Sequence, residues 1–135
     1  MTTETLGAAG RIDEIESAYE FMLAYAAQGK RGTEGGPASE IRGYLSRFVK
    51  ALDGLAETAA QEVEAAASAS QPAMTAFRET LEADAAHARA VLSLALAQPA
   101  ISSQMVDNLN ASIHVRTVLT DLFLLDSVLP NPSVR

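Results

Sequence analysis

The fold is decided first by residues 11–28, which read RIDEIESAYEFMLAYAAQ. Apolar side chains recur there at alternating steps of three and four residues, a spacing that places them on one stripe of an α-helix. Acidic residues lie off this stripe, so the segment is typical of an amphipathic helix that packs one face against a core. The stripe is formed by Ile12, Ile15, Tyr19, Met22 and Ala26.

The same periodicity continues in three further segments. A second helix is predicted over residues 38–68, directly after Pro37, since proline is favoured in the first turn of a helix. A third helix is predicted between Pro72 and Pro99, with Ser70 or Gln71 as its N-cap. A fourth begins near a capping serine, Ser102 or Ser103, and ends before Pro130 and Pro132.

The 135 residues are expected to form one domain, because a chain of this length can bury a single sizeable core. The predicted connections are short, so neighbouring helices should run antiparallel. We therefore expect an all-α protein built as an up-down antiparallel four-helix bundle. The alternative is a pair of long helical hairpins that complete their core in a dimer. The remaining parts are an N-terminal tail over residues 1–10, a glycine-rich interhelical loop over 29–37 and a C-terminal tail over 130–135.

Composition supports a helical chain and excludes several functions. The chain has 26 alanines and no cysteine, which favours helices and rules out disulfides and thiolate metal sites. Its formal net charge of −7 argues against nucleic acid as a partner, since phosphate binding depends on lysine and arginine. No apolar run approaches the roughly 18 residues that span a bilayer, and the first residues lack a signal peptide. We expect a soluble cytoplasmic protein without membrane contact.

Few residues offer catalytic or metal-binding chemistry. Gly29 and Lys30 lack the spacing of a phosphate-binding loop and follow a helix rather than a strand. Asp84 and His87 share a helical face, and His114 lies on the last helix, but a di-iron bundle needs two Glu-x-x-His pairs. A histidine phosphotransfer module is not favoured either, because neither histidine has a nearby lysine. The sequence therefore predicts no catalytic, cofactor or metal-ligating residue, and a protein that is not an enzyme.

The charges are unevenly distributed along the chain. Five of the ten basic residues fall between Lys30 and Lys50, whereas acidic residues dominate between Asp53 and Asp84. The two ends of the predicted second helix therefore differ in sign. Such an arrangement can set the register of a partner, although a solvated helix face is the favoured explanation, because such charge bias is common on soluble helices.

The last helix is apolar over more than half of its circumference. A helix of this kind is either central to its own core or shared with a second chain. We expect it to form an isologous homodimer, and the competing interpretation is that it is the most buried helix of a monomer. The predicted interface residues are Val118, Leu122, Phe123, Leu124, Leu125 and Val128.

These observations favour a non-enzymatic helical module for protein–protein interaction, such as a homodimeric adaptor, an assembly factor or a chaperone-like protein. The alternative is a sensor-type bundle that binds a small apolar ligand, because the alanine-rich helices leave room for a cavity. No cofactor is expected in either case. The predicted lining of that pocket is Tyr19, Met22, Phe48, Met74 and Phe77.

Overall fold

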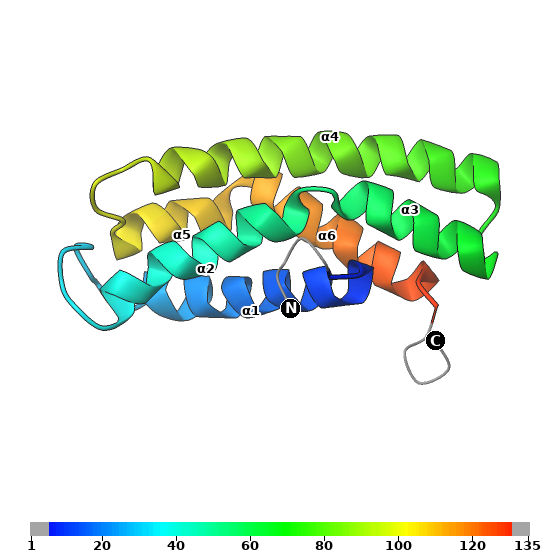
Figure 1. The fold of residues 1–135 in the computed structure, drawn as a ribbon. Helices are drawn as coiled ribbons and strands as arrows, with labels where there is room; N and C mark the ends of the chain where they lie inside the picture. Colours follow the sequence, from blue (N-terminus) through cyan, green and yellow to red (C-terminus); the bar gives the residue numbers. More distant parts are fainter. Residues whose placement is uncertain (1–5, 131–135) are drawn as a thin grey trace.

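The computed structural model describes residues 6–130 of the chain and shows an all-α protein (Figure 1). The expectation of an all-α class is confirmed, and this part of the chain contains no strand. The expected number of helices is wrong, because the predicted second and fourth helices are each divided in two. The described residues form α1 (Ala8–Ala26), α2 (Pro37–Leu52), α3 (Leu55–Ala66), α4 (Gln71–Leu96), α5 (Ser103–Ala111) and α6 (Ile113–Val128).

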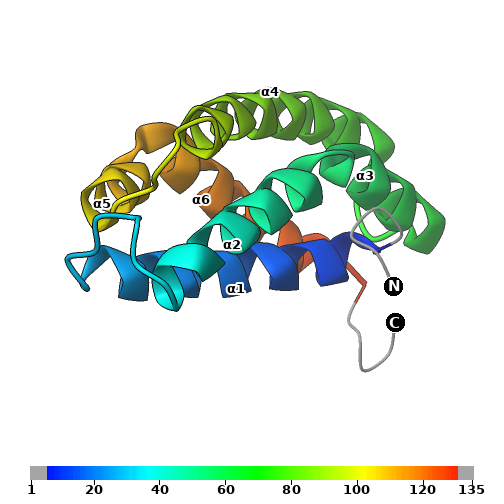
Figure 2. The same ribbon diagram turned by 60° about the vertical axis from the view of Figure 1, so that its left-hand side comes forward.

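The helices pack side by side into an elongated, bundle-like body (Figures 1 and 2). Helix α1 packs against α2 and α5, while α4 packs against α2, α3 and α6. The core between them is made of the apolar stripes of all six helices. Its largest fully buried side chains are Tyr25, Phe48, Ile15, Met22, Ile41, Leu45, Leu55, Leu81, Leu92, Ile101, Leu122 and Leu125.

The break between α2 and α3 is stabilised by a buried arginine of α1. Gly54 has a φ of 80°, in the left-handed region that glycine adopts without steric cost, so α2 ends there. The last carbonyls of a helix have no partner within it. The Arg11 guanidinium donates to the backbone oxygens of Lys50, Ala51 and Asp53, the last at 2.6 Å. A cation at this position also suits the negative end of the helix dipole.

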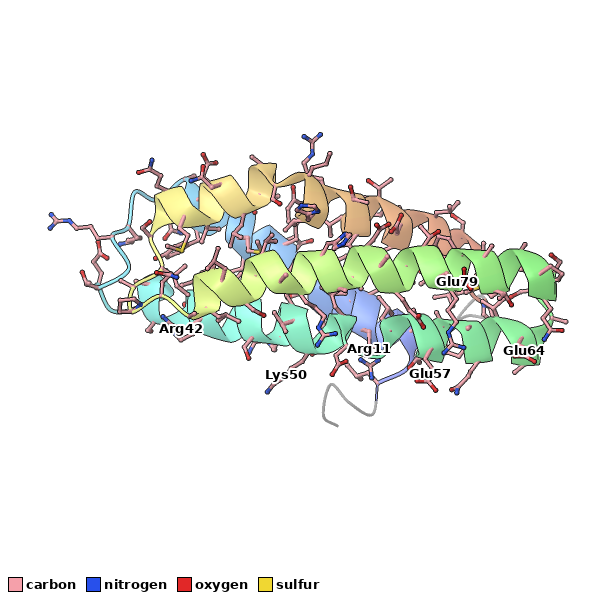
Figure 3. The ribbon with its side chains drawn as sticks, turned by 90° about the horizontal axis from the view of Figure 1, so that it is seen from above. Arg11, Arg42, Lys50, Glu57, Glu64 and Glu79 are labelled. Atoms are coloured by element: carbon pink, nitrogen blue, oxygen red, sulfur yellow. The ribbon has the colours of Figure 1, made fainter. Side chains whose placement is uncertain are left out.

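Two other helix ends are satisfied by side chains from distant parts of the chain. Arg42 of α2 donates to the backbone oxygens of Leu96 and Gln98, at 2.6 Å and 2.7 Å, where α4 ends. Glu62 of α3 accepts a 2.7 Å hydrogen bond from the first amide of α1, at Ala8. Charged side chains thus complement the dipoles of α1, α2 and α4 at one end each. Figure 3 shows Arg11 and Arg42 beside these helices.

The second break falls at Ser112, between α5 and α6. Its backbone is extended, and its hydroxyl accepts from the His114 amide at 3.2 Å, so it serves as the N-cap of α6. The change of direction lets α5 pack against α1 while α6 packs against α4. Local caps predicted from sequence are confirmed at two other helices, where Ser70 and Ser102 accept from the third residue on.

The glycine-rich loop is held in place at both its base and its tip. At the base, the Tyr25 hydroxyl donates to the Ile101 oxygen at 2.7 Å. The Lys30 amide donates to the Ser103 hydroxyl, and the Ser103 amide donates to the Lys30 oxygen. At the tip, the Glu34 carboxylate accepts amides of the loop, beginning with that of Arg31, and these bonds lower its pKa to about 2. Gly32 packs so closely on Ile101 that a Cβ would come within 2.6 Å of its backbone.

The predicted boundaries need small corrections. Helix α1 begins at Ala8, inside the stretch 1–10 that the sequence predicts as a tail. Helix α2 includes Pro37, which was predicted as the end of the loop. The outer parts of both tails, residues 1–5 and 131–135, lie outside the described residues. Within residues 6–130, no helix combines the length and the hydropathy that crossing a bilayer requires.

Replacing Arg11 tests its role at the end of α2. The variant Arg11→Met keeps much of the side-chain volume but leaves buried carbonyls without a donor, so we expect a loss of about 3 kcal/mol in the free energy of unfolding. The matched control is Arg42→Met, because Arg42 caps α4 from an exposed position and should cost no more than about 1 kcal/mol. Urea titration followed by circular dichroism measures both. Equal losses in the two variants would contradict this role.

Candidate functional site

Helix α4 packs against α5 and α6 along a line that is here called the seam. Apolar and polar side chains meet along it, including both histidines of the chain. Successive members of one set on α4 are separated by three, four or seven residues, so they share one face of that helix: Phe77, Asp84, His87, Val91 and Leu94. The opposite side of the seam is supplied by α5 and α6, which run antiparallel to α4 (Figure 1). Along the seam, an apolar hollow, a polar centre and a second apolar hollow follow one another.

The first hollow lies where α3 ends, α4 begins and α6 ends. It has a volume of about 210 Å³, and small alanines make the room for it. The exposed Leu124 side chain forms part of its rim. The hollow, here called the Phe77 hollow, is lined by Ala69, Ala73, Met74, Phe77, Leu124, Leu125 and Val128.

The second hollow lies at the other end of the seam, between α4 and α5. It has a volume of about 380 Å³. Its lining includes Leu94, of which 68% is exposed to solvent. The residues that line it are Val91, Leu94, Ala95, Gln98, Met105, Asn108, Leu109 and Ser112.

The polar centre between the hollows brings like groups together. The rings of His87 and His114 lie edge to face, with centroids 5.4 Å apart. Asp121 of α6 lies against Asp84 of α4, and one of its carboxyl oxygens is buried without a hydrogen-bond partner in the described structure. Burial, and then the hydrogen bond and repulsion from Asp84, raise the pKa of Asp121 to about 7. Asp121 is therefore largely protonated at mildly acidic pH.

This geometry does not assemble a metal site. Among residues 6–130, no group of three or more histidine, aspartate or glutamate side chains is arranged to hold a metal ion. The two histidines are close, but neither makes an ion pair with Asp84 or Asp121. Among the described residues, the polar centre is thus a contact between like groups, two carboxyls and two imidazoles, rather than a shared ligand set.

The predicted interface residues divide into two groups. Val118, Leu122 and Leu125 are at most 2% exposed and belong to the chain's own core, so they face the other helices of this chain. Val128 is partly buried against that core. Phe123 and Leu124 point outward and are 63% and 59% exposed.

Two large apolar side chains on the outside of the seam were not among the predicted interface residues. Ile113 is 71% exposed at the start of α6, and Leu94 is 68% exposed near the end of α4. A helix that ran continuously through Ser112 would place Ile113 four residues after the buried Leu109, on the same inward face. The extended backbone at that serine shifts the helical register, and Ile113 then lies on the outward face.

The predicted pocket residues do not all come together. Met74 and Phe77 both line the Phe77 hollow. Met22 and Phe48 are fully buried in the core, Tyr19 packs partly buried against it, and none of the three lines that hollow. The alanine-rich segments do leave room, but they leave it at the edge of α4 and α6 rather than between the aromatic side chains of α1 and α2.

The uneven distribution of charge coincides with the break at Gly54. Arg42 and Lys50 lie along α2, whereas Glu57 and Glu64 lie along α3, close to Glu79 of α4 (Figure 3). The change from basic to acidic residues, predicted within one long helix, thus falls between α2 and α3. Among the described residues, acids of this stretch form two ion pairs, the exposed Arg78–Glu82 pair and the Arg89–Asp53 pair at 3.6 Å.

Replacing Asp121 by asparagine tests the polar centre. The folded protein raises the pKa of Asp121, so its contribution to stability is complete below the ordinary aspartate pKa and is lost as pH rises through about 7. Asparagine cannot ionise, so Asp121→Asn should not lose this stability as pH rises. We expect it to be about 1 kcal/mol more stable than the natural chain near pH 8 and of similar stability near pH 4, as measured by urea unfolding.

The control is Asp107→Asn, which changes an exposed aspartate on α5 in the same way. A stability difference that varies with pH in Asp121→Asn but not in this control assigns the effect to the Asp121 carboxyl. A difference between Asp121→Asn and the natural chain that stayed constant from pH 4 to pH 8 would show that Asp121 does not titrate as described.

Comparison with protein-family models, with curated proteins and with solved structures gives no match to this chain. The function proposed below is therefore argued from the placement of the chain's own side chains.

Proposed function

We propose that this chain is a non-enzymatic helical interaction protein that acts as a homodimer through the outward face of α6. The observation that carries the proposal is the exposure of large apolar side chains. Residues 6–130 leave five such side chains exposed, and three of them lie on α6: Ile113, Phe123 and Leu124. The fourth, Leu94, lies on the neighbouring α4, and only Leu23 lies on α1.

Helix α6 is apolar on both of its sides. Its inner side is buried against α4 and α5. An outer side that carried only charged and polar residues would suit a helix at the surface of a monomer. The outer side of α6 instead combines three large apolar residues with two threonines, which is typical of a surface that another protein covers.

A second copy of the chain is the proposed partner because α6 offers both signs of charge beside this apolar surface. Arg116 on the outer side is exposed and makes no ion pair within the described structure. Acidic residues of α1 and α6 lie nearby, and their repulsion is felt at Glu16, whose pKa is raised by slight burial and then by Asp13, Asp126 and Glu20. A surface that is apolar at its centre and carries both charges at its margin suits self-association.

The oligomeric state tests the proposal. We expect a dimer at micromolar concentration by size-exclusion chromatography with light scattering. Phe123→Glu and Leu124→Glu should each raise the dissociation constant about 30-fold or more, because a carboxylate would have to be desolvated in the contact. Circular dichroism should show unchanged helix content, since both side chains are exposed.

The matched control is Leu23→Glu, which places the same charge on an exposed leucine of α1. It should leave the dimer intact. The proposal would be wrong if the natural chain stayed monomeric at tens of micromolar, or if the substitution at Leu23 disrupted association as strongly as that at Leu124.

A second candidate function is supported by the Phe77 hollow. Its lining is almost wholly apolar, its volume of about 210 Å³ suits a small aromatic or aliphatic molecule, and it includes Met74 and Phe77. In this case the chain would be a helical ligand-binding protein of the sensor type.

A thermal-shift screen with indole and short alkanols separates this candidate from self-association. A ligand that binds the folded state at about 100 times its dissociation constant adds about 2.7 kcal/mol of stability. Ala73→Leu fills the hollow and should abolish the shift, whereas Ala76→Leu, elsewhere on α4, should not. The ligand-binding function is excluded if no probe raises the melting temperature, or if both variants respond as the natural chain does.

A further inference from the structure

The outer surface of α6 has a symmetric pattern along its length, and this pattern specifies how two copies can meet. The inference rests on the proposed self-association. Ile113 lies at one end of the exposed face and Phe123 and Leu124 lie near the other, with Thr117 and Thr120 between them. Large apolar residues thus flank a centre formed by the two threonines, with the exposed Arg116 beside them. We call the three apolar residues and the two threonines the outer strip.

We propose that two α6 helices pair antiparallel across a twofold axis at the level of Thr117 and Thr120, so that each copy's Ile113 enters the other copy's Phe77 hollow. In this arrangement Ile113 of one chain lies opposite Phe123 and Leu124 of the other. A twofold axis makes the two contacts identical, as an isologous interface requires. The small central threonines let the helices approach closely at the axis.

The hollow lies on the correct side of the strip to receive this side chain. Leu124 belongs both to the outer strip and to the rim of the Phe77 hollow, so the two surfaces are continuous. An antiparallel twofold keeps α4 of both copies on the same side of the paired α6 helices. Ile113, the most exposed large apolar side chain of the described chain, therefore projects toward the hollow of its partner.

The shape of the hollow also favours this occupant. Ala69 and Ala73 leave a space of about 210 Å³ beside the Phe77 ring. A branched aliphatic side chain can fill such a space with its two terminal methyl groups and displace water from apolar walls. Ile113 at present buries little of its own surface, so it gains burial from the same contact.

The position of Ile113 disfavours the parallel arrangement. Parallel pairing of α6 about a twofold axis would stack Ile113 on Ile113, at the end of α6 remote from the Phe77 hollow. Antiparallel pairing brings Ile113 to the hollow and leaves Arg116 at the edge of the outer strip, on the side where α1 and α6 carry acidic side chains. Those acids include Glu16, Glu20 and Asp126. Slight burial, and then repulsion from Asp13, Asp126 and Glu20, raises the pKa of Glu16. A guanidinium beside them relieves that repulsion.

The absence of cysteine from the chain allows a direct test by disulfide trapping. Two single variants are made, Ile113→Cys and Leu124→Cys. These positions are eleven residues apart, or about 16 Å along a helix, which is too far for a disulfide within one chain or between equivalent positions of an antiparallel pair. We expect mild oxidation to cross-link the mixture of the two variants and to leave each variant alone uncross-linked.

A second measurement avoids altering the strip itself. Ala73→Leu fills the Phe77 hollow from α4 and should weaken the dimer about tenfold in analytical ultracentrifugation, since Ile113 can no longer enter. Ala76→Leu adds the same atoms to an exposed position of α4 that does not line the hollow, and should leave the dissociation constant unchanged.

The outcomes separate this inference from the proposed function. Cross-linking of Ile113→Cys with itself would demonstrate parallel pairing and overturn the inference, while the homodimer would stand. The same conclusion follows if light scattering shows a dimer but the mixed variants do not cross-link and Ala73→Leu associates normally. A chain that is monomeric throughout would remove the proposed function and the inference together.

Discussion

The buried guanidinium of Arg11 is the interaction on which the arrangement of the helices depends. A helix that ends inside a bundle leaves carbonyl groups that water cannot reach, and each such group is costly unless it finds a donor. Arg11 supplies donors to the end of α2 and also to the Leu6 oxygen before α1. The chain can therefore turn at Gly54 and send α3 along α4. Glu62 of α3 returns to cap α1, so the first three helices stabilise one another's ends.

The second half of the chain uses a serine for the same purpose. Ser112 ends α5 and caps α6, and the short change of direction lets one helix pack on α1 and the other on α4. Asn110 strengthens the first contact by donating to the Met22 oxygen at 3.2 Å. The seam between α4 and α6 is a consequence of this division. A continuous helix through residue 112 would carry a different set of side chains to that contact.

The side chains at the centre of the seam contribute to its stability in a different way from those at its two ends. Apolar side chains at the ends gain from burial, whereas the paired aspartates and paired histidines at the centre repel when they carry like charge. Packing of α4 on α6 is thus linked to protonation of Asp121. The apolar outer face of α6 lies over this contact. The surface proposed to bind a partner is therefore next to the contact whose packing depends on the protonation of Asp121.

The sequence by itself determined the helical class, the amphipathic stripes, the local serine caps and the position of the glycine-rich loop. All of these depend on residues within one or two helical turns, so local spacing reveals them. The tertiary structure alone decided the break at Gly54, because apolar spacing runs unbroken from Leu52 through Leu55 and the arginine that caps the break lies about forty residues away. It also decided the inward side of α6. A helix that is apolar nearly all round allows several inward faces, and only packing against α4 and α5 selects one, leaving Ile113, Phe123 and Leu124 outside.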